Sequence, residues 1–205
     1  MIRHAAPLAT IKVDLPRPDL SAREGVKLIH AHAVDSGPDW RGCMVSSEAA
    51  ANKNGRLVAG VGAWLVMYRA ASGANLIRAT LYSGGNVVFR KSTALVEPPP
   101  LFLLDTQWID STVVAEIVRR EPLIAGMEEN FGFTLALQAV PDLGLFWQLT
   151  RHCLVRPANI ALSHQFGVDA RHGEITVEVV QRIGPRGVMQ RRRRDRLTGG
   201  DWQDF

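Results

Sequence analysis

The chain has 205 residues, of which 46% are hydrophobic and 21% are charged, and its formal net charge is +4. This composition excludes a disordered tail protein, a collagen-like chain and a coiled coil. A chain of this length buries roughly 70% of the surface that its unfolded form exposes, so one core forms without a disulfide or metal staple.

The first third of the chain predicts a strand, a helix and a long connection. Residues 10–15 alternate polar and apolar side chains, which is typical of a strand that ends before Pro16. Ser21 and Glu24 form a capping box, and apolar residues then recur at helical spacing to Ala33. Residues 35–56 contain several turn-forming residues and are interpreted as a connection with one helical turn at 47–52.

The next segment predicts a buried strand and a hairpin. Residues 56–71 are apolar on both faces, as in a strand covered on both sides. Residues 75–82 and 86–96 flank a Gly84-Gly85 pair, whose residues adopt the positive φ angles of tight hairpin turns. A two-residue loop would bring a basic and aromatic set onto one face, where it could bind nucleic acid. This weaker candidate surface consists of Arg78, Tyr82, Phe89 and Lys91.

The middle of the chain is divided by prolines at positions 98–100, a possible lobe boundary at 97–100 between two halves of similar length. A second helix is predicted after Asp110 or Ser111 and ends at Glu121, before a proline. Residues 131–140 are predicted to form a strand. Residues 143–155 fit a helix or a strand, and the helix is favoured.

A second hairpin is predicted from residues 159–168 and 174–183. The register that pairs Val168 with Ile175 and His164 with Val179 places the branched apolar residues on one side. His164 then points inward, and Gln165 and Glu178 lie on the other side.

The order of these elements predicts an α+β fold. It consists of a largely antiparallel sheet with two or three helices, and the first elements could form a ferredoxin-like split βαβ core with extra strands. Residues 1–180 are predicted to be one domain, and residues 181–205 a basic C-terminal segment.

The positive charge is concentrated near the end of the chain. Residues 181–198 contain seven arginines and one acid, a net +6, so the remainder of the chain is at −2. Arginine suits phosphate because its planar fork binds two oxygens. The candidate nucleic-acid-binding residues are Arg182, Arg186, Arg191, Arg192, Arg193, Arg194 and Arg196. A solvated tail and a site for an acidic protein remain as alternatives.

The closing residues after Gly199-Gly200 contain Trp202 and Phe205 beside two acids. Aromatic residues carry much of the binding energy at interfaces, so Trp202 and Phe205 are candidates for docking a protein partner. The alternative is that Trp202 packs onto its own domain.

The sequence offers little support for catalysis. His164, Asp169, His172 and Glu174 are close in sequence, but three of them belong to a turn and lack metal-binding spacing. His164 is the weak candidate for a catalytic base. Neither a phosphate-binding loop nor a dinucleotide fingerprint occurs, so no metal or cofactor is predicted.

Cellular context is predicted from the cysteines and the apolar segments. Cys43 and Cys153 lie far apart without metal-ligand spacing, which predicts buried, reduced thiols. Lys12 and Asp14 interrupt the N-terminal residues before a signal-peptide core forms, and the apolar run of residues 57–68 is shorter than the roughly 20 residues of a membrane-spanning helix. A cytoplasmic protein with no membrane partner is expected.

The leading hypothesis is a non-enzymatic binding or assembly subunit of a complex that contains RNA or DNA, with its arginines on phosphates and with a protein partner or a second copy bound. The alternatives are a viral or phage-like structural protein that self-assembles, and a small-molecule enzyme with a site near His164.

Overall fold

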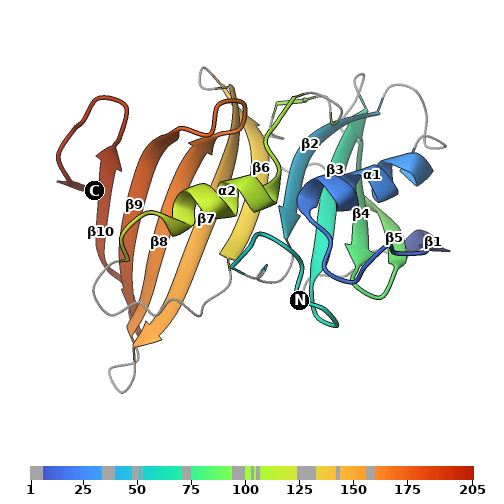
Figure 1. Cartoon of the computed structure of the whole chain (residues 1–205), viewed down its shortest axis with the longest axis horizontal. Helices are drawn as coiled ribbons and strands as arrows, with labels where there is room; N and C mark the ends of the chain where they lie inside the picture. Colours follow the sequence, from blue (N-terminus) through green and yellow to red (C-terminus); the bar gives the residue numbers. More distant parts are fainter. Residues whose placement is uncertain are drawn as a thin grey trace.

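The computed structural model describes residues 7–33, 40–47, 51, 53–70, 75–93, 100–102, 104, 107–123, 133–141, 144–155 and 160–205. These residues form two helices and eleven strands (Figure 1). The helices are α1 (Ala22–Ala33) and α2 (Ser111–Arg119). The strands are β1 (Pro7–Lys12), β2 (Trp40–Ser47), β3 (Ala63–Ala70), β4 (Asn75–Tyr82), β5 (Asn86–Thr93), β6 (Phe133–Val140), β7 (Gly144–Val155), β8 (Ile160–Asp169), β9 (Ile175–Gly184), β10 (Gly187–Asp195) and β11 (Gln203–Asp204).

The strands form one sheet that repeats the same arrangement in two halves. In each half a helix is followed by a four-stranded meander, β2 to β5 and β6 to β9, and β2 pairs antiparallel with β6 in the middle. β1 lies beside β5 at one edge, and β10 lies beside β9 near the other. Both helices lie on the same face of the sheet (Figure 1). We call the other face the open face, because no helix of the described residues covers it.

The predicted α+β fold with a ferredoxin-like core is wrong. A split βαβ unit contains parallel strands, whereas the neighbouring strands of this 11-stranded sheet pair antiparallel throughout. The two helices have only 12 and nine residues. The fold is therefore one long antiparallel sheet with a short helix over each half.

Four strands were not predicted, namely β2, β7, β10 and β11. β10 and β11 lie within residues 181–205, which were predicted only as a basic C-terminal segment. The favoured helix at 143–155 is β7, where Leu145, Trp147 and Leu149 are buried while Gln148 between them is exposed. This alternation has the period of a strand. The predicted connection at 35–56 contains β2, in which Cys43 and Val45 are buried. The predicted helical turn at 47–52 lies largely outside the described residues.

The helices begin where the sequence predicts, and their N-termini meet. The backbone N–H of Ser21 donates to Glu24, whose own N–H donates to the Ser21 hydroxyl, so the capping box forms. Asp110 caps α2 by accepting the N–H of Ser111 at 2.7 Å, and it also accepts the N–H of Arg23 in α1 at 3.0 Å. One carboxylate thus stabilises the positive ends of both helix dipoles.

Each half buries a tryptophan beneath its helix. Trp64 in β3 and Trp147 in β7 are fully buried, and their indole N–H groups donate to Leu20 O at 3.0 Å and Ile109 O at 2.8 Å. A Cβ atom at Gly25 would lie 2.6 Å from the Trp64 ring, so α1 approaches the sheet closely only with glycine there. These satisfied indoles fix both helices against the sheet.

Both predicted hairpins are present, but each register differs from the prediction. β4 and β5 are joined by a three-residue loop in which Gly85 has φ +81°, so Ala79 rather than Thr80 lies opposite Phe89. Glycine suits this left-handed position of a three-residue hairpin loop. The predicted two-residue loop would have shifted every pair by one residue.

In the second hairpin the pair Val168–Ile175 is as predicted, but Thr176 forms a bulge. The pairing beyond it therefore shifts by one residue, and Phe166 lies opposite Glu178. Glu178 consequently projects to the helix-bearing face beside His164, and not to the face of Gln165 as predicted.

The remaining predictions concern membranes and thiols. Within the described ranges, neither helix is long and apolar enough to cross a membrane. Cys43 and Cys153 are buried thiols that form no disulfide within the described residues, as predicted, and burial raises the pKa of the Cys43 thiol to about 11. The possible lobe boundary at 97–100 lies mostly outside the described residues.

Candidate nucleic-acid interface

The four consecutive arginines of the basic segment lie in a paired strand. β10 pairs with β9 along most of its length, and β11 pairs with Arg192 and Arg193. Because successive side chains of a strand point to opposite faces, Arg191 and Arg193 project to the open face. Arg192 and Arg194 project to the helix-bearing face.

On the helix-bearing face, acids of the chain itself bind the arginines. Glu178 accepts hydrogen bonds from Arg194 at 2.5 Å and Arg196 at 3.2 Å, and its second oxygen lies 2.5 Å from His164 Nε2. Arg196 also donates to both oxygens of Glu121, at 2.9 and 3.1 Å. Burial by itself raises the pKa of Glu178, but the hydrogen bonds from His164 and Arg194 outweigh it and lower the pKa to about 2. Arg194 and Arg196 therefore have their charge compensated within the fold.

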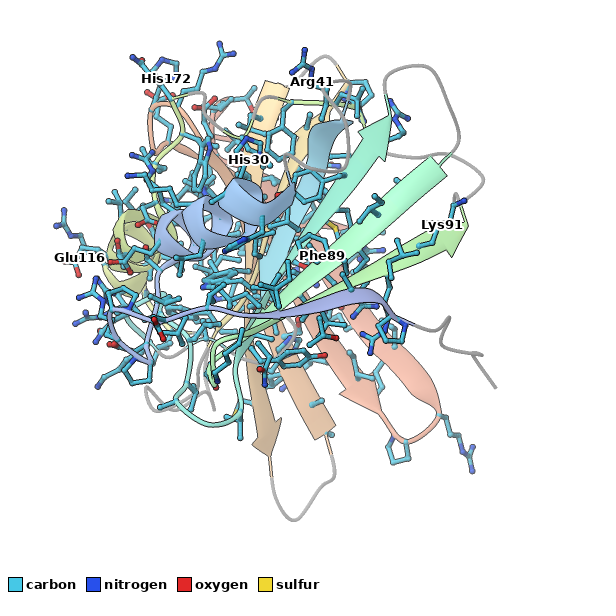
Figure 2. The ribbon with its side chains drawn as sticks, turned by 90° about the vertical axis from the view of Figure 1, so that its right-hand side faces the viewer. His30, Arg41, Phe89, Lys91, Glu116 and His172 are labelled. Carbon is cyan, nitrogen blue, oxygen red and sulfur yellow. The ribbon has the colours of Figure 1, made fainter. Side chains whose placement is uncertain are left out.

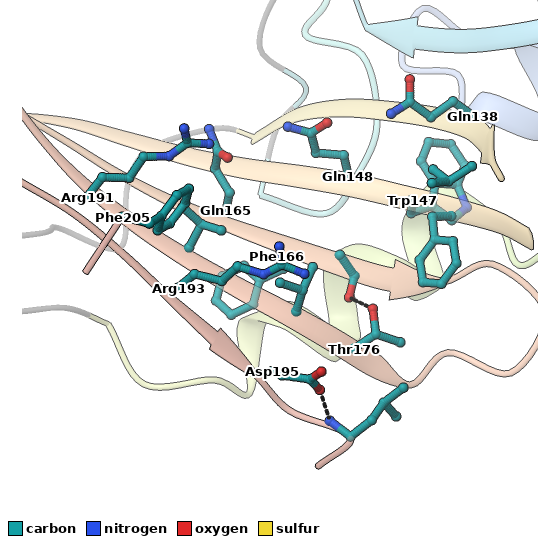
Figure 3. A pocket seen from close by; sticks show the side chains of 16 residues that line it. Gln138, Trp147, Gln148, Gln165, Phe166, Thr176, Arg191, Arg193, Asp195 and Phe205 are labelled. Atoms are coloured by element: carbon teal, nitrogen blue, oxygen red, sulfur yellow. Dashed lines mark hydrogen bonds between the residues drawn. The ribbon is translucent and has the colours of Figure 1, made fainter. Parts of the chain in front are cut away.

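On the open face, strands β6 to β10 form a groove of about 330 Å³ (Figure 3). This volume falls within the range of roughly 300–1,000 Å³ found for small-molecule sites. Its lining combines amides, apolar groups and arginines: Gln138, Gln148, Gln165, Phe146, Val177, Val179, Arg191, Arg193 and Phe205 are among the residues that form it.

The groove is positively charged. Among the described ion pairs, neither Arg191 nor Arg193 has an acidic partner within 4 Å. Asp195 is the acid in the lining, and its carboxylate accepts the backbone N–H groups of Leu197 at 2.9 Å and Thr198 at 3.2 Å. Two guanidinium groups that have no ion-pair partner among the described residues therefore face the groove, against the single carboxylate of Asp195.

A small residue leaves room for the groove in the second half of the sheet. Counted from the central pair Val45–Leu137, Gly167 and Val177 of the second half correspond to Arg78 and Arg90 of the first. A Cβ atom at Gly167 would lie 2.4 Å from Val177 Cγ1. The first half thus carries two long side chains at the positions where the second half has glycine and valine.

The weaker candidate surface predicted on the first hairpin does not form, because its register is shifted. Phe89 packs in the core, 5% exposed, and Lys91 lies opposite Ile77 on the same face as Phe89. Arg78 and Tyr82 lie on the open face. Figure 2 shows Phe89 in the body of the molecule and Lys91 near its rim.

His164 points inward, as predicted, and lies away from the groove. It is 1% exposed and contacts the Phe166 ring at 4.1 Å between centroids. Asp169 shapes the β8–β9 turn, since its carboxylate accepts the N–H groups of Arg171 and His172, both at 2.8 Å. No three His, Cys, Asp or Glu side chains of the described residues are grouped as metal ligands. The buried ring of His164 does not line the groove, so this geometry does not support it as a catalytic base.

The other predicted site residues lie outside or at the rim of the groove. Arg182 is exposed in β9 on the helix-bearing face, and Arg186 is exposed in the turn between β9 and β10. Trp202 and Phe205 pack onto β10 of their own chain, over Arg194 and Arg191 respectively.

Sequence reasoning missed the amides and apolar side chains of the groove. Phe146 and Gln148 were assigned to a predicted helix, and the bulge at Thr176 turns Val177 and Val179 to the open face. The alternation of buried and exposed positions in β7 was the available signal for a strand.

Comparison of the chain with protein-family models, curated proteins and solved structures finds no match. The fold defines an antiparallel sheet protein with a cationic groove on its open face, and the chemistry of that groove is the basis for a function.

Proposed function

We propose that the protein binds single-stranded nucleic acid in the groove on the open face. The observation that carries this proposal is the position of Arg191 and Arg193, two uncompensated guanidinium groups at the rim of a groove with an apolar and amide floor. Their planar forks suit phosphate oxygens.

The floor has the groups that unpaired bases require. Phe146 and the side chains of Val177 and Val179 offer an apolar surface to a base, and Gln148 and Gln165 offer donors and acceptors to its edge. Sheet surfaces that bind single strands use the same combination of stacking and amide contacts. In a duplex the bases are stacked and paired, so a floor of this kind favours a single strand.

Fewer arginines face the groove than the basic segment contains, so fewer phosphate contacts are expected than the sequence alone suggested. Arg194 and Arg196 are bound to Glu178 and Glu121, so the proposed groove contacts come from Arg191 and Arg193, about two phosphates, and not from all seven arginines of the basic segment. For a single strand, two contacts give a slope of log affinity against log salt of about −1.4. That the protein is a binding subunit of a larger complex stays a prediction.

The test is fluorescence anisotropy with a labelled 12-nucleotide single strand, as RNA and as DNA, at low salt. We expect Arg191→Gln with Arg193→Gln to weaken binding more than tenfold. Arg120→Gln with Arg171→Gln is the matched control, because it removes the same two charges from exposed positions outside the groove. Absence of binding by the unchanged protein, or equal loss in the control, refutes the proposal.

A further inference from the structure

The residues that follow β10 return to it as a short segment, Trp202–Phe205. The chain turns after Asp195, whose carbonyl accepts the N–H of Gly200 at 3.1 Å. The segment then pairs with β10 through Arg192–Asp204 and Arg193–Gln203, and the Phe205 N–H donates to Arg191 O at 3.2 Å. It therefore lies directly along the outer edge of the arginine strand.

Three side chains of this segment contact β10 arginines. The Arg191 guanidinium carbon lies 4.2 Å from the centre of the Phe205 ring. The centre of the Trp202 ring lies 5.6 Å from the guanidinium carbon of Arg192 and 5.0 Å from the guanidinium carbon of Arg194. Asp204, in the same short segment, has its Oδ1 atom 3.4 Å from Arg192 Nε in β10.

These contacts resemble those of a nucleotide in their chemistry. An aromatic ring stacks on a guanidinium, as a base does, and a carboxylate neutralises the neighbouring arginine, as a phosphate does. Figure 3 shows Phe205 beside Arg191 at the end of the groove. The segment thus occupies the edge along which a strand bound in the groove would continue.

The segment is held weakly. Phe205 is 58% exposed, and the Asp204 side chain is 76% exposed. Exposed cation–π contacts and surface ion pairs each contribute little, and β11 has only two residues. A polyanion that brings several phosphates can therefore displace it.

We propose that the Trp202–Phe205 segment occupies a second nucleotide subsite along β10, which a single strand longer than the groove fills by displacing the segment. This inference rests on the proposed function of the groove. It assigns Arg191 on the open face and Arg192 on the helix-bearing face to the phosphates and bases of a long strand that leaves the groove and passes around the β10 edge. The segment acts as a competitor within the chain.

The first experiment compares the affinities of a dinucleotide and a 12-nucleotide single strand. In the full chain, Trp202→Ala with Asp204→Asn removes two competing side chains that do not line the groove, and leaves Phe205, which lines it, unchanged. We expect affinity for the 12-mer to rise about tenfold and affinity for the dinucleotide to stay within twofold. Leu8→Ala, an exposed apolar residue in β1 at the other edge, is the control and should change neither. An unchanged or weaker affinity for the 12-mer overturns the inference.

The second experiment follows displacement in the unchanged protein. The fluorescence of Trp202 is obtained by subtracting the fluorescence of the Trp202→Phe variant. Acrylamide should quench this fluorescence more strongly when the 12-mer saturates the protein, because the displaced side chain is more exposed. Unchanged or reduced quenching overturns the inference. The two failures are distinguishable. The proposed function fails when the arginine variants of the groove leave binding of both oligonucleotides unchanged, whereas the inference fails when the groove binds the dinucleotide but the segment variant or the quenching gives the contrary result.

Discussion

Glu178 in β9 forms ion pairs with Arg194 and Arg196, and its replacement by glutamine tests how much these contacts stabilise the fold. Glutamine keeps the shape of the side chain but removes the negative charge that faces His164, Arg194 and Arg196. In the folded protein, His164 and Arg194 outweigh the effect of burial and lower the pKa of Glu178 from 4.5 to about 2. At about 1.4 kcal/mol per pKa unit, the ionised carboxylate contributes about 3 kcal/mol to the free energy of unfolding at pH 7.

The sign of the pH dependence follows from the lowered pKa. Because the folded pKa lies below the unfolded one, the contribution is complete above pH 4.5 and is lost as the pH falls towards 2. At pH 3 about 1.4 kcal/mol of it remains. The difference in stability between the unchanged protein and Glu178→Gln should therefore shrink by about half between pH 7 and pH 3.

Urea denaturation followed by circular dichroism at both pH values measures these differences. Glu116→Gln is the control, because Glu116 lies on the outer surface of α2 and pairs with exposed arginines at 3.3 and 3.4 Å. Such surface pairs contribute about 0–1 kcal/mol. A loss below about 1 kcal/mol for Glu178→Gln at pH 7, or the same loss at both pH values, would show that the ionised carboxylate of Glu178 does not stabilise the fold in this way.

Three further predictions concern the groove floor, the helix caps and a buried thiol. Gly167→Ala places a Cβ atom 2.4 Å from Val177 Cγ1 and should lower stability by about 1–3 kcal/mol in urea denaturation; an unchanged midpoint contradicts the packing. Asp110→Ala removes the acceptor shared by both helices and should cost about 1–2 kcal/mol, whereas Asp201→Ala, at an exposed position, should cost under about 0.5 kcal/mol; equal losses contradict the shared cap. Cys43, buried and with its pKa raised to about 11, should react with a thiol reagent at pH 8 only after unfolding, and rapid reaction of the native protein contradicts its burial.

Local patterns predicted the elements that local chemistry determines. The capping residues Ser21 and Asp110 mark the helix starts because their oxygens accept N–H groups within one turn. Gly85 marks a hairpin because its φ of +81° suits glycine. The register of that hairpin depends on whether the loop has two or three residues, and both choices fit the same Gly-Gly pair.

The fold class failed because one decision depends on tertiary contacts. Residues 144–155 contain enough apolar side chains for either period, and pairing with β6 and β8 on both sides determines that they form a strand. With this strand in place of a third helix, the second half repeats the first, and the sheet is continuous because β2, which was also missed, pairs with β6 in the middle.

The groove could not be predicted from one sequence because its lining comes from five strands. Gln138, Phe146, Gln165 and Val177 have no shared local pattern, and only the pairing of β6 to β9 brings them together. The arginine run was visible, but the acid that neutralises Arg194 is 16 residues away in sequence. Charge counts alone therefore overestimated the number of free arginines.

Photo-crosslinking of a single-stranded oligonucleotide, with 4-thiouridine in RNA or 4-thiothymidine in DNA, followed by peptide mass spectrometry, shows directly whether nucleic acid lies in the groove. We expect crosslinks to the groove residues of β7 to β10, with Phe146 among them, and their loss in the variant with Arg191→Gln and Arg193→Gln. Crosslinks confined to α1, α2 or the helix-bearing face, or none with either RNA or DNA, would show that the groove does not bind a single strand.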